Sequence, residues 1–235
     1  MKRLSRLTLL FALAFALFLS VPAFLTRPAG PTPGMLVGDW VDLLTPLVLI
    51  PLYWLLFKVR EDALFSSGEI LAFLLFVVLW VQGQGVHLAA NSIGHLVSAS
   101  GPAYDLIYFY DERLGHILWH VGIMGLSAVL ALRQARHLFE GQQSTLIVEG
   151  LAGLVYGVAF AFASLEGQTA LLGFPFAAGV VAILAVGAGG RLRSGPLLAF
   201  FFAGYLAASL VFAGWGLYCG GFPEPLKVIQ AGGCR

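Results

Sequence analysis

The stretch ILAFLLFVVLWVQGQGVHLAANSIGHLV, residues 70–97, decides the fold class. It contains no Asp, Glu, Lys or Arg, and about 20 apolar residues suffice for a helix to cross the hydrocarbon core of a bilayer, roughly 30 Å thick. Its first twelve residues are wholly apolar, whereas the remainder carries Gln84, His87, Asn91 and His95. Polar groups inside a membrane cost free energy unless they are paired or ligated. The stretch therefore predicts a membrane-spanning helix with a functional polar end.

Six further apolar stretches have a similar length, separated by breaks rich in Pro, Gly or charge. The composition agrees, because 59% of the residues are hydrophobic and 11% are charged, against about a quarter charged in soluble domains. We expect an all-α polytopic membrane helix bundle of about seven transmembrane helices, forming a single integral membrane domain over residues 1–235. The predicted spans are 7–25, 35–57, 70–97, 114–132, 146–165, 170–188 and 197–218.

The distribution of Lys and Arg predicts the orientation, because cytoplasmic loops carry an excess of both. With the N-terminus inside, the loops on the cytoplasmic side hold nine of them and those outside hold four, so we expect the C-terminus outside. The cytoplasmic residues are Lys2, Arg3, Arg6, Lys58, Arg60, Arg133, Arg136, Arg191 and Arg193. As an alternative, the basic start and the triplet Val21-Pro22-Ala23 resemble a secretory signal, whose cleavage would leave six spans.

The net charge of +1 offers no basic surface for nucleic acid. The partner that the composition predicts is the lipid bilayer, in the cytoplasmic or plasma membrane. An oligomer or a larger complex is left open.

Four of the five histidines fall on the third and fourth spans, and they follow helical spacing. Gln84, His87, Asn91 and His95 lie at i, i+3, i+7 and i+11, which is one face of a helix. On the next span, Glu112, His116 and His120 lie at i, i+4 and i+8. Both polar faces interrupt otherwise apolar helices.

An antiparallel arrangement of these two spans predicts which residues face each other. The short connection around Gly101-Pro102 implies neighbouring helices with a hairpin centre near Ala103 and Tyr104. Residues whose numbers sum to 207 then lie at equal depth. The predicted pairs are His87 with His120, Asn91 with His116, and His95 with Glu112.

Imidazole nitrogens and a carboxylate held by two helices are the ligands that Zn, Fe or Cu requires. We predict a divalent transition metal, with zinc in first place, bound by His87, His95, Glu112, His116 and His120. Gln84 and Asn91 would orient the imidazoles or serve as weak ligands. Structural hydrogen bonding between helices, a proton relay and haem are the alternatives. Haem is disfavoured because helices of one hairpin lie about 8–10 Å apart, too close to enclose a porphyrin.

Two enzymatic functions fit such a site, and whether the protein is an enzyme is left open. The first is a zinc hydrolase in which Glu112 or Asp111 acts as general base on a lipid ester or amide. The second is an Fe or Cu oxidase or hydroxylase. A non-enzymatic metal- or proton-handling transporter, or a small subunit of a larger membrane complex, is the alternative.

No known family accounts for the pattern. A retinal protein is excluded because the last span contains no lysine, and Lys227 lies beyond its end. The order of His95, Asp111 and the pair His116 and His120 partly resembles the alkaline ceramidase and adiponectin receptor superfamily, which holds zinc within the membrane. That family's paired histidines lie near its last span, so the resemblance assigns neither fold nor activity.

Other acidic residues are expected to serve mainly structural roles. Asp39 and Asp42 begin the second span and suit a helix start at the outer interface, although Asp42, Asp111 and Glu166 could complete a carboxylate shell. Glu149 and Tyr156 are expected to form a local hydrogen-bonded pair.

The two cysteines, Cys219 and Cys234, both fall on the predicted outer side, and we expect a disulfide between them.

Overall fold

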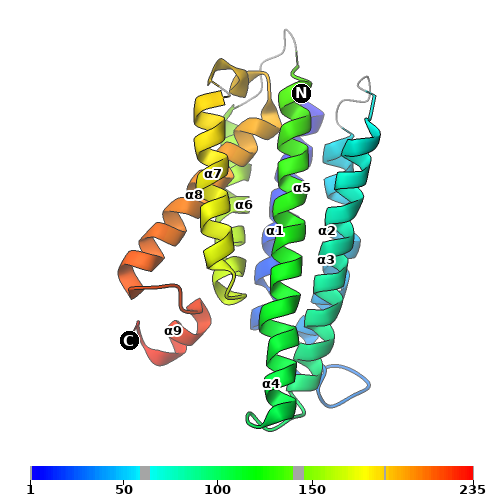
Figure 1. Ribbon diagram of the computed structural model, residues 1–235, viewed down its shortest axis with the longest axis vertical. Coiled ribbons are helices and arrows are strands. Elements are labelled where there is room, and N and C mark those ends of the chain that lie inside the picture. The colour runs from blue at the N-terminus through cyan, green and yellow to red at the C-terminus, as the bar shows by residue number, and fades with distance from the viewer. Residues whose placement is uncertain (1, 59–63, 140–145, 188, 235) are drawn as a thin grey trace.

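A computed structural model describes residues 2–58, 64–139, 146–187 and 189–234, and shows an elongated helical bundle (Figure 1). Seven helical segments are long and apolar enough to cross a membrane, which confirms the predicted fold class. The long helices are α1 (Lys2–Ser20), α2 (Val37–Phe57), α3 (Ser67–Gly94), α5 (His116–Arg136), α6 (Leu146–Glu166), α7 (Ala170–Gly187) and α8 (Pro196–Cys219). The short ones are η1 (Pro22–Phe24), α4 (Pro102–Tyr108), η2 (Phe109–Gly115), η3 (Gly189–Arg193) and α9 (Pro225–Ala231).

The long helices alternate in direction, so the chain ends lie at opposite ends of the bundle (Figure 1). One end carries α4, the turn at residues 95–101 and α9, and we call it the α4 end. The N-terminus lies at the other end. The fourth span runs as one helical stretch over Pro102–Arg136, twelve residues earlier than its predicted start at 114. The orientation of this bundle relative to the cytoplasm stays a prediction.

Helices α3 and α5 pack in an antiparallel register that differs from the predicted one. Gly83 lies against Trp119, Gly115 against His87, and Gly122 against Trp80. The residue numbers of each pair sum to 202 rather than 207, so the predicted register is wrong.

The turn between α3 and α4 explains this difference. Helix α3 ends at Gly94, and the hairpin reverses over residues 95–101, before Ala103 and Tyr104. Gly101 adopts a φ of 97°, a left-handed conformation that favours glycine, and Pro102 then starts α4. The reversal therefore comes a few residues earlier than the sequence pattern indicates.

Close contact between glycines joins α6 to α8. A side chain at Gly153 or Gly157 would collide with the backbone of α8 at Phe200 or Gly204. Small residues let membrane helices approach closely and gain dispersion contacts. Next to this contact, the Tyr156 hydroxyl bonds Ser127 Oγ at 2.8 Å and the Tyr205 hydroxyl at 3.1 Å. These helices form the close-packed part of the bundle.

The predicted pairing of Glu149 with Tyr156 is wrong. Thr8 Oγ1 donates to Glu149 Oε2 at 2.7 Å, across 141 residues of sequence. Glu149 is fully buried between α1 and α6. Its partner comes from α1, while Tyr156 turns toward Ser127 and Tyr205.

At the end opposite α4, Arg133 is buried and well partnered. Its Nη1 lies 3.0 Å from Glu69 Oε2, and its Nε donates to the Phe57 carbonyl at 3.0 Å. Its guanidinium lies 4.2 Å from the centre of the Phe65 ring. Such an arrangement satisfies a buried cation by hydrogen bonds, charge and ring contact together.

Helix α9 follows α8 at the same end of the bundle as α4 and lies next to the end of α8 (Figure 1). Cys219 and Cys234 lie at disulfide-bonding distance, with Cα atoms 5.0 Å apart, as predicted. The bond closes the chain segment that contains α9 and holds this helix near the end of α8.

Candidate metal centre

A π-helical segment, η2, positions the first part of the site. It interrupts the fourth span between α4 and α5 over Phe109–Gly115. In a π-helix residues five apart lie above one another, whereas in an α-helix residues four apart do. The segment therefore places Asp111 on the same face as His116, facing His87 on α3. Short π-helical segments within α-helices often occur at functional sites.

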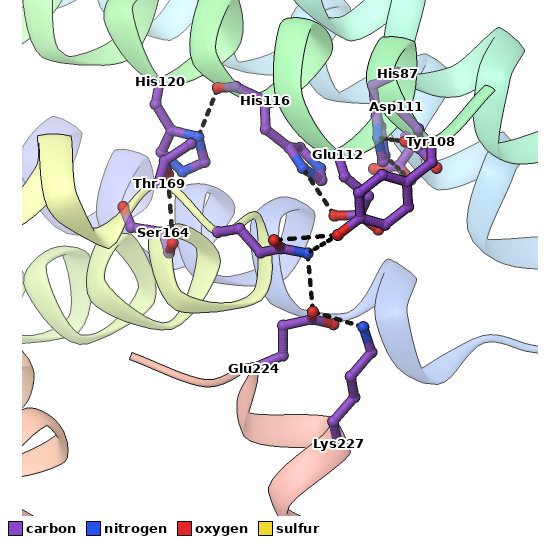
Figure 2. A network of polar contacts seen from close by, with 12 residues as sticks. His87, Tyr108, Asp111, Glu112, His116, His120, Ser164, Thr169, Glu224 and Lys227 are labelled. Atoms are coloured by element: carbon purple, nitrogen blue, oxygen red, sulfur yellow. Dashed lines mark hydrogen bonds and ion pairs between the residues drawn. The ribbon is translucent and has the colours of Figure 1, made fainter. Parts of the chain in front are cut away.

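Three side chains from the two helices converge at the α4 end (Figure 2). His87 Nδ1 and Asp111 Oδ1 lie 2.6 Å apart, and the rings of His87 and His116 have centroids 4.5 Å apart. One ligand atom from each of these residues lies within 4.8 Å of the other two. His87, Asp111 and His116 therefore form a group that could hold a metal ion.

The hydrogen bond to Asp111 orients the imidazole of His87. An ionised carboxylate only accepts, so a neutral His87 donates from Nδ1 and keeps the lone pair on Nε2. That Nε2 lies 4.0 Å from Asp42 Oδ2 on α2. A metal ion held by His87 Nδ1 and Asp111 together would replace this hydrogen bond, because Nε2 points away from Asp111.

Unpartnered polar atoms mark the same place. His116 Nδ1 and Glu112 Oε2 lie 3.4 Å apart, but neither atom forms a hydrogen bond among the described residues. Both atoms are buried. Buried polar atoms without partners cost about 1–3 kcal/mol each and are rare in structural positions. These two atoms fit a ligand that completes their bonding.

A cavity of about 280 Å³ opens beside the group. The ends of α1, α2, α3, α5 and α6, with η1 and η2, line it at the α4 end. Its lining includes His87 and His116 together with a set of carboxyl groups, and no Lys or Arg among the described residues. The carboxyl groups belong to Asp39, Asp42, Glu112, Glu166 and Glu224.

Two residues of the predicted ligand set lie apart from the group. His95 follows the end of α3, and its Nδ1 donates to the Gly34 carbonyl at 2.9 Å. His120 lies one helical turn deeper, where its Nδ1 donates to the His116 carbonyl at 2.9 Å. The buried Nε2 of His120 has no hydrogen-bond partner among the described residues. The structure thus brings together two of the four predicted histidines, with Asp111 and Glu112.

The predicted supporting amides have different neighbours. Asn91 Nδ2 donates to Asp39 Oδ1 at 3.1 Å, and Ser92 Oγ donates to the other oxygen of the same carboxylate at 3.1 Å. Asn91 still lines the cavity. Gln84 is buried one turn deeper, and its amide has no hydrogen-bond partner among the described residues.

The cavity also gathers acidic residues to which the sequence analysis gave little weight, Asp42 and Glu166, and one that it missed, Glu224. Asp42 faces His87, and Glu166 and Glu224 line the side nearest α9. The signal available in the sequence was their common position at or beyond the outer ends of the spans. Asp39 combines both roles, because it also caps α2 by accepting from the Leu36 backbone at 2.9 Å.

A polar network joins α9 to this end of the bundle (Figure 2). Gln168 Nε2 donates to Tyr108 and to Glu224 Oε1, both at 2.9 Å, and the Leu226 backbone donates to Glu166 Oε1 at 2.6 Å. Lys227 Nζ lies 2.6 Å from Glu224 Oε1. Partial burial lowers the pKa of Lys227, but the Glu224 carboxylate outweighs it and raises that pKa above its usual value. Helix α9 thus covers one side of the cavity.

Fold and site together define a class: a protein of seven membrane-spanning helices with a His/Asp group that could hold a metal ion. Comparison with known proteins adds one distant similarity. Over 107 residues, the chain is 23% identical to human ceroid-lipofuscinosis neuronal protein 6, a match that spans 34% of this chain and 34% of that protein. No family model and no solved structure matches. The function must therefore be argued from the site.

Proposed function

We propose that the protein is a membrane-embedded metalloenzyme that binds one divalent transition metal ion, in the first place zinc, through His87, Asp111 and His116. The observation that carries the proposal is the convergence of three ligand atoms from two helices within 4.8 Å of one another. Zinc at about 2.0–2.1 Å from tetrahedral ligands spaces neighbouring donors about 3.4 Å apart. Small side-chain rotations from the described positions reach that spacing.

The number of ligands favours a catalytic site over a structural one. Structural zinc sites have four protein ligands, whereas catalytic sites have three and keep one position for water or substrate. The group offers three ligands, and its remaining side faces the cavity of about 280 Å³. Among the described residues, the group has three members, and its open side coincides with room for a substrate.

The residues around this position support hydrolysis. Zinc bound there would lower the pKa of a water molecule to about 7. Glu112 lies beside His116 and lines the cavity, so its carboxylate can accept the proton of that water. Asp42 is placed to orient the imidazole of His87 from the opposite side. A lipid ester or amide is the substrate class that such a site reaches from the membrane.

A specific observation favours iron as the second candidate. Two histidines and one carboxylate with open positions form the facial triad of non-haem Fe(II) oxygenases. His87, His116 and Asp111 have that composition. In this case the function would be an oxidation or hydroxylation of an apolar substrate, and the metal content of the purified protein distinguishes the two.

Metal analysis by mass spectrometry tests the proposal directly. We expect about one zinc ion per chain in wild-type protein purified without chelator, and strong loss in His116→Ala. His137→Ala is the matched control, because His137 ends α5 at the opposite end of the bundle and should keep the full content. Wild-type protein that binds no transition metal, even after addition of zinc or iron, would rule the function out.

A non-enzymatic role in proton handling is supported by polar groups deeper in the bundle. The hydroxyls of Ser127, Tyr156 and Tyr205 form a chain of hydrogen bonds, and Glu149 is buried at the far end with one oxygen unpartnered among the described residues. Together, the hydroxyl chain, Glu149 and the candidate metal site place polar groups in both halves of the bundle. Proton flux into proteoliposomes that is abolished by Glu149→Gln, with metal content unchanged, would favour this role over hydrolysis.

A further inference from the structure

An apolar groove of about 570 Å³ lies on the outside of the bundle between α1 and α6. Its lining includes Ala16, Ser20, Phe24, Leu154, Val158 and Phe162. Of the described residues that line it, Ser20 alone is polar. Its volume falls within the range of about 300–1,000 Å³ that is usual for small-molecule sites.

This groove adjoins the polar cavity. Phe162 lines both hollows. On α1 and η1, Leu19 and Ala23 line the cavity, while their neighbours Ser20 and Phe24 line the groove. The rings of Phe24 and Phe162 lie parallel, with centroids 6.2 Å apart and an interplanar angle of 14°. This ring pair stands at the boundary between the apolar groove and the acidic cavity.

The dimensions of the groove match one leaflet of a bilayer. Its lining on α6 runs from Leu154 to Phe162, a rise of about 12 Å at 1.5 Å per residue. One leaflet contributes about half of a hydrocarbon core roughly 30 Å thick. The groove therefore extends from the α4 end, where a head group would lie, to about the middle of the membrane, where a hydrocarbon chain would end.

The charge of the cavity restricts the head group. Among the described residues, five carboxyl groups line it and no Lys or Arg does. Lys227, the nearby cation, is already paired with Glu224. Five carboxylates outnumber the charges of one divalent metal ion and Lys227 together, so Coulomb repulsion at short range in a partly buried site disfavours an anionic head group. A neutral or cationic head group avoids this repulsion.

From these observations we infer that the substrate is a lipid with one hydrocarbon chain in the α1/α6 groove and a head group without net negative charge in the cavity. This inference rests on the proposed function for its catalytic meaning, because the head group would lie beside His87 and His116. The groove supplies binding energy by apolar burial, and the cavity supplies selectivity by charge. Phe24 and Phe162 lie where the chain would pass from one hollow to the other.

Photolabelling tests the inference with two probes, hexadecylamine and hexadecanoic acid, each bearing a diazirine near its methyl end. The purified full-length protein is labelled in detergent, and labelled peptides are identified by mass spectrometry. We expect the amine to label the segments 16–24 and 154–162 several-fold more than the acid. Competition by unlabelled hexadecylamine should remove this labelling.

Two substitutions locate the probe. Val158→Trp fills the groove and should lower its labelling by the amine about tenfold, because the loss of two buried methylenes has this effect on affinity. Leu210→Trp is the matched control, since Leu210 lines a second apolar groove between α6 and α8, whose lining shares no residue with the cavity. Ser20→Phe fills the first groove from α1 if Val158→Trp does not fold.

The metal content of the same samples keeps this inference separate from the proposed function. Val158→Trp should keep its metal and lose the groove labelling, while His116→Ala should lose its metal and keep the labelling. Wild-type protein without metal, but with selective groove labelling, refutes the metal function and supports the lipid site. Labelling that is equal on all lipid-facing helices, or equal for the two probes, overturns the inference whatever the metal content.

Discussion

Arg133 and His116 are both buried on α5, near opposite ends of the α3–α5 helix pair, but their polar atoms differ in hydrogen bonding. At one end Arg133 is bonded to Glu69 and to the Phe57 carbonyl, and it contacts an aromatic ring. At the α4 end, His116 Nδ1 and Glu112 Oε2 are buried without a hydrogen bond among the described residues. The same two helices supply both environments. Partnered polar groups thus fasten the helices together, whereas unpartnered ones indicate where a ligand completes the bonding.

The largest effect is expected at the partnered end, where Glu69→Ala removes the carboxylate that lies 3.0 Å from the buried Arg133. Breaking a buried ion pair costs about 3–5 kcal/mol. The free energy of unfolding in detergent should fall by this amount, with metal content per folded protein unchanged. If Glu69→Ala lost its metal but kept its stability, the two ends of the bundle would be energetically coupled.

At the α4 end, His116→Ala should leave the stability of the metal-free protein nearly unchanged, whereas His87→Ala should cost about 1–3 kcal/mol because Asp111 loses its hydrogen bond. Their metal affinity should fall by more than about 100-fold, because changes even to residues that support metal ligands cost 10–100-fold. Competition with a chromogenic chelator measures the affinity, and chemical unfolding measures the stability. A variant that loses several kcal/mol without metal would show that the histidines are structural.

Acidification should separate the two ends without any mutation. A metal ion binds only the neutral form of an imidazole and competes with protons for it, so its affinity falls as pH drops. Between pH 7 and pH 5, we expect metal affinity to fall by more than about tenfold. The bundle should remain folded over this range. Glutamate has an ordinary pKa of about 4.3, so Glu69 stays ionised beside Arg133. Circular dichroism and metal release at each pH provide the measurement.

The smallest effects should come from the histidines outside the group. His120→Ala and His95→Ala should each retain most of the metal, since their Nδ1 atoms donate to backbone carbonyls. This result would distinguish the observed register, in which paired residue numbers sum to 202, from the predicted one, in which they sum to 207 and His120 pairs with His87. Equal loss of metal in His120→Ala and His116→Ala would support the predicted pairing.

The sequence allowed the helical bundle to be predicted because long apolar runs in a membrane have few alternative structures. The pairing of the cysteines could also be predicted, since the sequence contains two. The start of the fourth span could not, because residues 102–113 carry Asp105, Asp111 and Glu112, which lowered the apparent hydropathy of a segment that is helical. Helix formation there extends beyond the apolar run.

The candidate site was predicted in its location and in part of its composition. His87, His116 and Glu112 were chosen for their spacing, and they do lie at one cavity. Asp111 was assigned as a base rather than a ligand, because α-helical periodicity places it on a different face from His116. The π-helical segment changes that periodicity, and no composition rule announces it. The contribution of Asp42 from α2 depends on tertiary packing, which residue spacing within a helix does not report.

The π-helical segment also has a consequence for how such a site can arise and disappear. A π-helical turn contains about one residue more than an α-helical turn, so the loss of one codon within residues 109–115 would restore regular helix. The contacts of Trp119 and Gly122 with α3 lie beyond this segment and would persist. Asp111, however, would rotate by about 100° around the helix axis, away from His87. A single in-frame deletion could therefore preserve the helical bundle and remove the candidate metal site.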